Sequence, residues 1–295
     1  MERIIFGDNQ FFAVNHISDE KAMQQSIRFR HNSAIIRTLE QSRAEGIQTF
    51  MCTTHERIGE ICAWMRANEG WRNYTIYPCM PYAHKYANSV TEMGISGTLR
   101  KYVPGNVFGS LFKGGVAMLS RDYLSIMELL IDAEMKMFRG MHTPVIFLQN
   151  VVTDLLLGLQ MKEVLAAFAQ YVRRKYNAEP GFITMNLPML VHTLEQAGVK
   201  DAIVCASINK AGFRMSGGKS LYEKVLAEKK VRVIAMQVLA GGAIPAREAI
   251  EYVTSLSGVD SILFGASSVQ NIRETVEWIH RYDQQRIRAS MPVLV

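Results

Sequence analysis

Cysteine is scarce in this sequence. The four cysteines among 295 residues, Cys52, Cys62, Cys79 and Cys205, form no CxxC pair and follow no regular spacing. Structural zinc sites and disulfide-rich secreted domains depend on such spacings. The cysteine pattern therefore argues against both classes and predicts reduced thiols in a cytoplasmic protein.

Long apolar runs are also missing. No stretch approaches the ~20 apolar residues of a membrane-spanning helix, and the apolar part of the N-terminus is too short for a signal peptide. No linker rich in Pro, Gly or Ser divides the chain. We therefore expect no membrane partner, a cytoplasmic location and a single folded domain over residues 1–295.

Charge of one sign is nowhere strongly concentrated. Lys and Arg number 33 and Asp and Glu 27, which leaves a formal net charge of +6. The densest basic runs lie at 28–37, 173–175 and 281–288, and no nucleic-acid-binding motif accompanies them. We interpret these runs as solvated helix faces, expect no nucleic-acid partner, and retain a small anionic ligand as the charged partner.

The sequence does contain a regular alternation of short apolar, β-branched runs with longer stretches of helical period. The expected strands are 3–8, 47–54, 74–80, 144–150, 181–186, 202–208, 231–239 and 261–265. The expected helices are 33–45, 55–69, 121–139, 153–176, 187–197, 221–229, 246–255 and 269–284. Strands that are apolar on both faces and separated by helices form parallel sheets through right-handed crossovers. The eight units predict an α/β fold, a (β/α)8 TIM barrel.

Two connections are longer than a minimal barrel needs. They follow the first and third expected strands, at 9–32 and 87–120, on the C-terminal face where barrel enzymes build active sites. The second contains six glycines together with Phe108, Phe112 and Lys113. It reads as a lid over a ligand, or else as a surface insertion or an oligomer contact, so a homo-oligomer stays open.

Polar side chains gather where the expected strands end. A barrel mouth lined with amides and hydroxyls is costly unless a polar ligand satisfies them, which suits a sugar-like or nucleotide-like substrate. The residues expected to bind this substrate are Gln149, Asn150, Asn186, Asn209 and Gln237.

The same face offers candidates for acid–base catalysis. They are Asp8, His55, Glu56, His84 and Lys85, which follow the first three expected strands. A neighbouring carboxylate or ammonium can tune a histidine pKa across neutral pH, and helix capping is the competing role for both histidines. The spacing of these groups matches no metal-ligand motif, so we expect no metal.

Two segments near the C-terminus resemble a known family. VIAMQVLAGG at 233–242 and GVDSILFGASS at 258–268, followed by NIRE at 271–274, are similar to the last two strand units of the aldo-keto reductases. Weaker similarity extends to 181–186 and 46–50. The resemblance implies a TIM barrel that binds a nicotinamide dinucleotide, which makes NADPH the candidate for an otherwise unknown cofactor.

The glycine-rich loops in these segments predict an anion site. Bare backbone N–H groups and the N-terminus of the last helix can approach a phosphate there. In the family that the segments resemble, this region holds the dinucleotide, and a Ser and an Arg contact the adenosine 2′-phosphate. The competing interpretation is that the glycines only permit tight turns. The candidate cofactor-binding residues are Gly241, Gly242, Gly265, Ser267, Ser268 and Arg273.

The catalytic residues of the aldo-keto reductases are not retained. That family uses an Asp, a Tyr, a Lys and a His at the ends of strands two to four. The Asp falls here at Met51 or Cys52 and the Tyr near His55. The Lys falls near Met80 and the His at Gln149. Without a phenol positioned to protonate a carbonyl as hydride arrives, ordinary carbonyl reduction is not the expected reaction.

We therefore expect an aldo-keto reductase-like enzyme that acts by acid–base chemistry on a small phosphorylated or nucleotide-linked polar metabolite, a sugar derivative. One alternative is an NADPH-dependent carbonyl oxidoreductase with a rebuilt acid at His55 or His84. Another is a non-catalytic barrel that senses a nucleotide or binds a partner protein.

Overall fold

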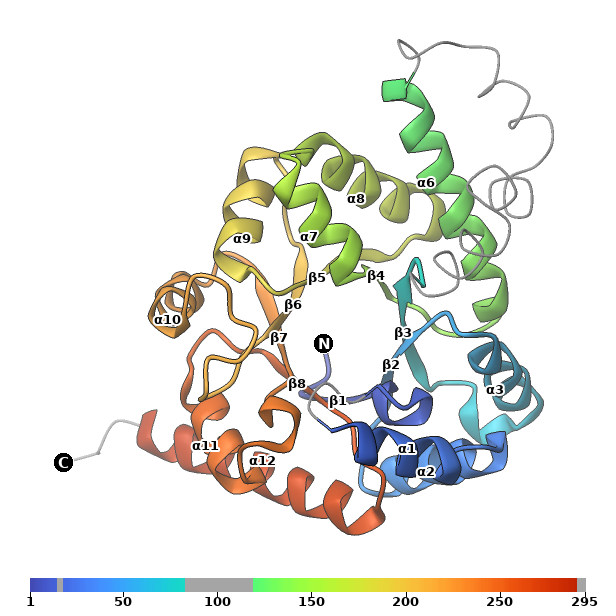
Figure 1. Cartoon of the computed structure of the whole chain (residues 1–295), viewed down its shortest axis with the longest axis vertical. Helices are drawn as coiled ribbons and strands as arrows, with labels where there is room; N and C mark the ends of the chain where they lie inside the picture. Colours follow the sequence, from blue (N-terminus) through green and yellow to red (C-terminus); the bar gives the residue numbers. More distant parts are fainter. Residues whose placement is uncertain (15–17, 83–118, 291–295) are drawn as a thin grey trace.

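Eight parallel strands close into a barrel in the computed structural model, and helices surround it (Figure 1). The strands follow one another around the ring in sequence order, and the first pairs with the last to close it. The structure describes residues 1–14, 18–82 and 119–290. Most of the expected lid at 87–120, together with His84 and Lys85, lies outside the described residues.

All eight predicted strands are present. They are β1 (Ile4–Gly7), β2 (Thr49–Thr53), β3 (Thr75–Met80), β4 (Val145–Leu148), β5 (Glu179–Thr184), β6 (Ile203–Ser207), β7 (Arg232–Met236) and β8 (Ser261–Phe264). The TIM-barrel prediction is confirmed, although β7 ends three residues before the predicted boundary of 239.

The helices follow the strands as the fold requires. They are α1 (Asp19–Arg28), α2 (Asn32–Ala44), α3 (Glu56–Ala67), α6 (Leu119–Met135), α7 (Asn150–Gly158), α8 (Lys162–Tyr176), α9 (Leu187–Gln196), α10 (Lys219–Glu228), α11 (Ala246–Ser255) and α12 (Val269–Ser290). Short 3-10 turns are η1 (Asn9–Phe12), η2 (Glu69–Trp71), η4 (Lys136–Phe138) and η5 (Ala240–Gly242).

Two connections differ from the sequence prediction. The helix expected at 153–176 is broken into α7 and α8, because Gln160 adopts a left-handed φ of 57°, which an α-helix cannot accommodate. The connection expected at 9–32 is not a bare loop, since it contains η1 and α1. The second difference matters for the site, because η1 and α1 lie in the connection that leaves the C-terminal end of β1.

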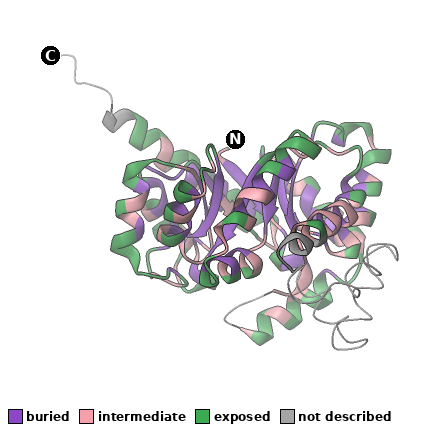
Figure 2. Ribbon diagram, turned by 90° about the horizontal axis from the view of Figure 1, so that it is seen from above, coloured by how far each residue is buried: buried purple, intermediate pink, exposed green. Residues whose placement is uncertain are grey.

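Side chains of alternate strand residues fill the inside of the barrel. Ile5, Met51 and Phe147 belong to one buried cluster in this interior, whereas Ile4 and Phe6 pack outward in the cluster beneath the helices. Gly181 is required here, because a Cβ at that position would lie 2.4 Å from the Phe147 ring. Figure 2 shows the result, with buried strands at the centre and exposed residues on the outer faces of the helices.

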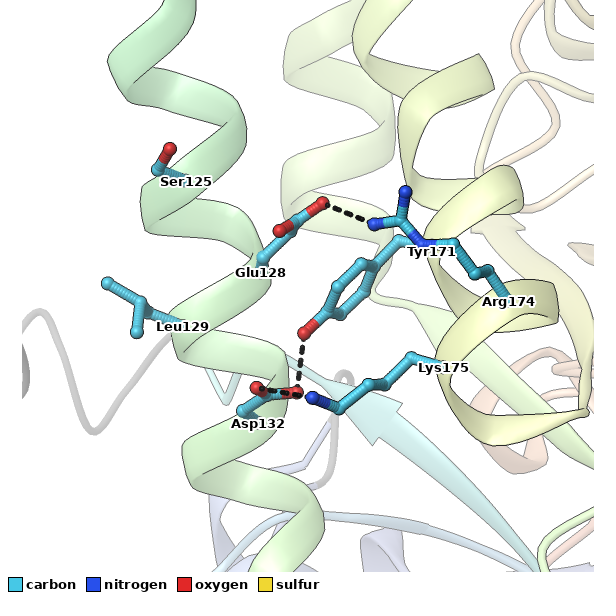
Figure 3. A pocket seen from close by; sticks show the side chains of 7 residues that line it. All are labelled: Ser125, Glu128, Leu129, Asp132, Tyr171, Arg174 and Lys175. Carbon is cyan, nitrogen blue, oxygen red and sulfur yellow. Dashed lines mark hydrogen bonds and ion pairs between the residues drawn. The ribbon is translucent and has the colours of Figure 1, made fainter.

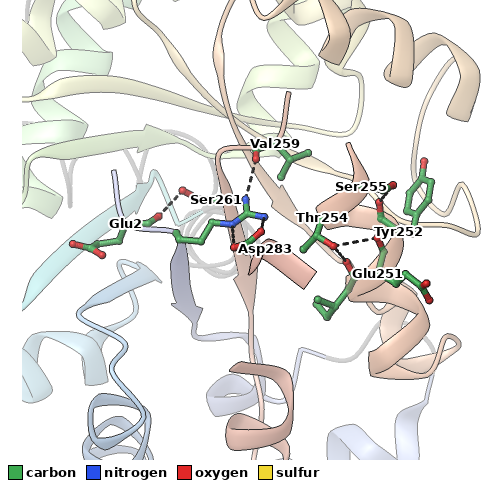
Figure 4. Close-up of polar contacts among 10 residues, drawn as sticks. Glu2, Glu251, Tyr252, Thr254, Ser255, Val259, Ser261 and Asp283 are labelled. Carbon is green, nitrogen blue, oxygen red and sulfur yellow. Dashed lines mark hydrogen bonds and ion pairs between the residues drawn. The ribbon is translucent and has the colours of Figure 1, made fainter. Parts of the chain in front are cut away.

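Polar contacts tie the start of the chain to its last helix (Figure 4). The Arg3 guanidinium donates to both carboxylate oxygens of Asp283, at 2.8 and 2.7 Å, and to the carbonyl of Val259 at 2.9 Å. The Ser261 hydroxyl donates to the carbonyl of Glu2 at 2.5 Å. These bonds reinforce the seam between β1 and β8. None of the described helices is long and apolar enough to cross a bilayer.

Candidate functional site

A cavity of about 920 Å³ opens at the C-terminal end of the barrel. It starts among the ends of β1 to β5 and extends between α1 and the loops that follow β7 and β8. Ligand cavities for small molecules span about 300–1,000 Å³, so this one has the right size for a metabolite or a dinucleotide. Its position matches the active-site face of TIM barrels.

Asp8 lies at the end of β1 and lines this cavity, as predicted. Its side chain is buried, and its Oδ2 atom accepts hydrogen bonds from the backbone N–H and the hydroxyl of Thr53, both at 2.7 Å. Burial raises the Asp8 pKa to about 6, and the two bonds from Thr53 only partly oppose the rise. A carboxyl group with such a pKa can give or take a proton near neutral pH.

Tyr82 is another ionisable group near Asp8, and sequence reasoning gave it no role. It follows β3, lines the cavity, and its ring lies 5.6 Å from the His55 ring between centroids. Burial raises the pKa of its phenol, and the Asp8 charge raises it further. Tyr82 is therefore a neutral phenol that lines the same cavity as Asp8.

His55 has the capping role that was the alternative to catalysis. Its Nδ1 atom accepts a hydrogen bond of 3.2 Å from the backbone N–H of Arg57, which caps α3. Burial, followed by the Arg57 charge, lowers the His55 pKa, and its ring stacks on Phe12 at 4.2 Å. Neither His55 nor the exposed Glu56 is among the residues that line the cavity.

Three of the five amides predicted to bind substrate reach the cavity, namely Gln149, Asn150 and Gln237. The other two, Asn186 and Asn209, form hydrogen bonds with backbone groups instead. Asn186 caps α9 by accepting from the Met189 N–H at 3.3 Å. Asn209 is buried and makes two hydrogen bonds to the backbone of Phe213.

Gln237 is held in an unusual conformation. Its φ is 53°, in the left-handed region, and its Oε1 atom accepts a hydrogen bond of 2.7 Å from the Ser207 hydroxyl. A left-handed non-glycine residue costs free energy, and such residues concentrate at functional sites. Because its Oε1 atom is bonded to the Ser207 hydroxyl, the Gln237 amide has a fixed orientation in the cavity wall.

The predicted anion site is only partly assembled. Gly241, Gly242, Gly265 and Ser267 all line the cavity. Ser268 instead accepts from the backbone N–H of Asn271 at 3.2 Å, at the start of α12.

Arg273 does not reach this part of the cavity. It is exposed and pairs with Glu45 of the C-terminal end of α2, at 2.9 and 3.0 Å. The resemblance predicts that Arg273 contacts a 2′-phosphate. In this structure its side chain pairs with Glu45 instead. Its role in binding therefore stays a prediction without support from its contacts.

Glycine is needed at position 265 because a neighbouring side chain leaves no room for a Cβ, and not because of a turn conformation. A Cβ at Gly265 would lie 2.0 Å from Oε1 of Gln10, and Gln10 is held by a 2.8 Å bond from its Nε2 to the carbonyl of Gly7. Gly242 has a φ of 94°, so a larger residue would be strained there. Bulky substitutions at these two glycines would therefore disturb the protein itself as well as any bound anion.

The wall that α1 provides beside η1 was not predicted from the sequence. Gln10, Lys21, Gln25 and Arg28 line the cavity, and Arg214 does so from the loop after β6. The available signal was the spacing of Lys21, Gln25 and Arg28, which places polar residues on one face of a helix. No cluster of three or more potential metal ligands occurs among the described residues.

A second hollow, of about 500 Å³, lies between α6 and α8 (Figure 3). Arg174 pairs with Glu128 at 3.3 Å, and Lys175 pairs with Asp132 at 3.7 Å. The Tyr171 hydroxyl donates to Asp132 at 2.6 Å. Because these charges neutralise one another across the groove, they explain how the two helices are held together and offer little to a charged ligand.

Comparison with known proteins identifies the fold. No family model and no curated protein matches the sequence. Among solved structures, a Pseudomonas aeruginosa protein assigned to the aldo-keto reductases is 14% identical, with a TM-score of 0.56 over 95% of this chain and 90% of that one. Aldose reductase from Giardia lamblia is 11% identical, with a TM-score of 0.51 over 97% and 92%.

Gox0644 in complex with NADPH is 8% identical, with a TM-score of 0.52 over 88% of this chain and 85% of that one. These similarities span nearly the whole barrel, and they agree with the resemblance of the last two strand units. At such low identity they establish the architecture and leave the chemistry to the residues in the cavity. The chain is a divergent (β/α)8 barrel with the fold of the aldo-keto reductases.

Proposed function

We propose that this chain is a cytoplasmic enzyme that uses Asp8 for acid–base chemistry on a small phosphorylated or nucleotide-linked polar metabolite, a sugar derivative. The observation that carries the proposal is the buried Asp8 carboxyl, with a pKa of about 6, in the wall of a cavity that amide and basic side chains also line. A carboxyl group that is buried beside a substrate cavity and titrates near neutral pH is the usual form of a general acid or base.

The rest of the cavity supports a polar, anionic ligand. Gln149, Asn150 and Gln237 supply amides, and the glycine-rich loops after β7 and β8 supply backbone N–H groups. Lys21 and Arg28 add positive charge on the facing wall. These amides, N–H groups and cations can bind the hydroxyl and phosphate groups of a ligand.

A second candidate is an NADPH-dependent carbonyl oxidoreductase in which Asp8 or Tyr82 replaces the family's acid. The length of the cavity favours it, since the cavity runs from Asp8 to the loops after β7 and β8, and the similar Gox0644 binds NADPH. The cavity size and the glycine loops fit a dinucleotide, whereas the pairing of Arg273 with Glu45 does not fit its predicted contact with a 2′-phosphate. A bound nicotinamide would supply the hydride for such a reaction.

Two measurements test the proposal. Thermal melting with NADPH, NADP and a panel of sugar phosphates identifies the ligand class, and the ligands that stabilise the protein are then incubated with it in D2O. Proton abstraction by Asp8 predicts that carbon-bound hydrogen exchanges with solvent deuterium, visible by NMR, and that Asp8→Asn slows this exchange by about 100-fold or more.

The outcomes separate the functions. If Asp8→Asn leaves the rate of hydrogen exchange unchanged, Asp8 is not the acid or base of the reaction. Stabilisation by NADPH alone, with loss of its absorbance when carbonyl compounds are added, would favour the oxidoreductase. Absence of any stabilising ligand would favour a barrel that binds a partner protein.

A further inference from the structure

Helix α1 presents its polar face to the barrel and its apolar face to solvent. Lys21, Gln25 and Arg28 line the cavity, at positions i, i+4 and i+7 of the helix. On the opposite side Met23 and Ile27 are 66% and 67% exposed. A helix on the surface of a globular protein normally shows the reverse arrangement. The inward polar face therefore needs an explanation other than folding.

The segment that carries this face is anchored in the core at both ends. Phe11 of η1 and Phe29, which follows α1, are each 1% exposed and meet in an edge contact at 4.9 Å. Arg57 donates to the carbonyl of Phe29 at 2.6 Å. These contacts hold α1 against the barrel mouth, so its polar face is a fixed part of the cavity wall.

Lys21 sits beside the glycine-rich loop after β7. Its Nζ atom lies 3.5 Å from the position that a Cβ at Gly242 would take. Neither Lys21 nor Arg28 forms an ion pair with any carboxylate of the described residues. Glu274, an acidic residue in the same lining, accepts instead from Gln270 on its own helix at 2.8 Å.

Two amide oxygens of the same wall lack partners. The Oε1 atoms of Gln10 and Gln25 are buried and accept no hydrogen bond, although Gln10 is held through its Nε2 atom. Gln10 is only 4% exposed. A buried polar atom without a partner is unfavourable unless a ligand supplies one. No hydrogen bond fixes the Gln25 amide, and the torsion before an amide is soft, so it can turn to meet a hydroxyl group.

We infer that η1 and α1 form a recognition wall for the phosphorylated, hydroxyl-bearing part of the ligand. Lys21 and Arg28 bind the phosphate over the Gly242 loop, and Gln25 accepts a hydrogen bond from a ligand hydroxyl. The inference rests on the proposed function and narrows its ligand class to sugar phosphates or the ribose–phosphate portion of a nucleotide. It also assigns phosphate binding to the helix after β1, in addition to the loops after β7 and β8.

Binding measured by calorimetry, without turnover, tests this wall. The probes are ribose 5-phosphate, ADP-ribose and inorganic pyrophosphate, which carries no sugar hydroxyl. Lys21→Met should weaken the binding of all three by about ten-fold, which corresponds to 1.4 kcal/mol. The matched control Lys224→Met removes the same charge from α10, outside the cavity lining, and should bind like the parent.

Gln25→Leu should weaken the two sugar probes by about ten-fold and leave pyrophosphate binding unchanged. The same variant should melt at the parent's temperature or above it without ligand, because it removes an unpaired buried acceptor. A structural role for Gln25 predicts the opposite, a lower melting temperature, and would overturn its assignment.

The inference fails if no phosphorylated probe binds the parent, or if Lys21→Met binds them as tightly as the parent does. These results are independent of the catalytic proposal. If hydrogen exchange continues in Asp8→Asn, Asp8 is not the catalyst. Phosphate binding can still depend on Lys21 in that case.

Discussion

Asp8 shows how the barrel produces an unusual carboxyl group. The end of β1 places it inside the mouth, 6% exposed, where β2 supplies only the N–H and hydroxyl of Thr53 as partners. No cation among the described residues forms an ion pair with it. Desolvation therefore dominates, and the pKa rises to about 6 from 3.8.

This pKa makes the stability of the protein depend on pH in a defined direction. The folded state keeps the Asp8 proton up to about pH 6, whereas the unfolded chain loses it near 3.8. The contribution of Asp8 to stability is therefore highest in acid and falls as pH rises through this interval. Above pH 6 the loss amounts to up to about 3 kcal/mol.

Asp8→Asn cannot titrate and should escape this loss. We expect its free energy of unfolding, relative to the parent, to increase between about pH 4 and pH 7, as measured by urea denaturation at both pH values. A variant that is more stable at neutral pH and inactive would show the usual conflict between stability and function. A difference that does not change with pH would contradict the raised pKa.

Several single residues could not be placed from the sequence because their partners are distant in the chain. Arg273 pairs with Glu45, which is 228 positions away, so its departure from the predicted phosphate contact has no local signal. Asp8 and three of the five predicted amides do line the cavity, since residues at the ends of parallel strands share one face. His55 could be assigned to neither role until its bond to the Arg57 N–H was known.

Element boundaries followed the sequence where periodicity was strong. The helix predicted at 246–255 is α11 without change, and all eight strands were found. The break between α7 and α8 was missed, because both halves are apolar at helical spacing and Gln160 carries no turn signature. Helix α1 was missed because only three of its ten residues, Ala22, Met23 and Ile27, are apolar, so no apolar helical period stands out.

The contact between η1 and the loop after β8 gives a test of how these elements fit. Gly265→Ala should cost about 1–3 kcal/mol of unfolding free energy, because the new methyl group would lie 2.0 Å from Gln10 Oε1. Adding Gln10→Ala removes the obstacle, so the double variant should be more stable than the sum of the single effects predicts, by at least about 0.5 kcal/mol.

Gly158→Ala is the matched control, because a Cβ there meets nothing within 4 Å. It should leave stability unchanged or raise it slightly, since alanine favours a helix more than glycine does. Additive effects of Gly265→Ala and Gln10→Ala would show that the two positions do not touch, and the packing described for this corner of the cavity would be wrong.

The whole barrel depends on joining its first strand to its last. β1 and β8 pair in register from Ile4 opposite Ile262 to Phe6 opposite Phe264, and Arg3 extends the join by reaching Asp283 in α12. The cavity lies at the other end of the same two strands, with Asp8 after β1 and Gly265 after β8. The position of the Asp8 carboxyl relative to the loop after β8 is thus set by closure of the ring.

Arg3→Met should therefore weaken the molecule more than loss of an ordinary surface charge. The Arg3 and Asp283 side chains are only 24% and 20% exposed, the contact is bidentate, and a third bond reaches Val259. We expect a loss of about 1–2 kcal/mol in urea denaturation, smaller than for a fully buried pair because water screens part of it.

Arg72→Met provides the comparison. Its ion pair with Glu69 spans three residues of one turn, with side chains 70% and 86% exposed, so removing it should not change stability measurably. Because closure also sets the distance between Asp8 and the loop at Gly265, Arg3→Met should in addition weaken ligand binding at the opposite end of the barrel, whereas Arg72→Met should not. Equal melting temperatures for the two variants would show that the seam is held by strand pairing alone.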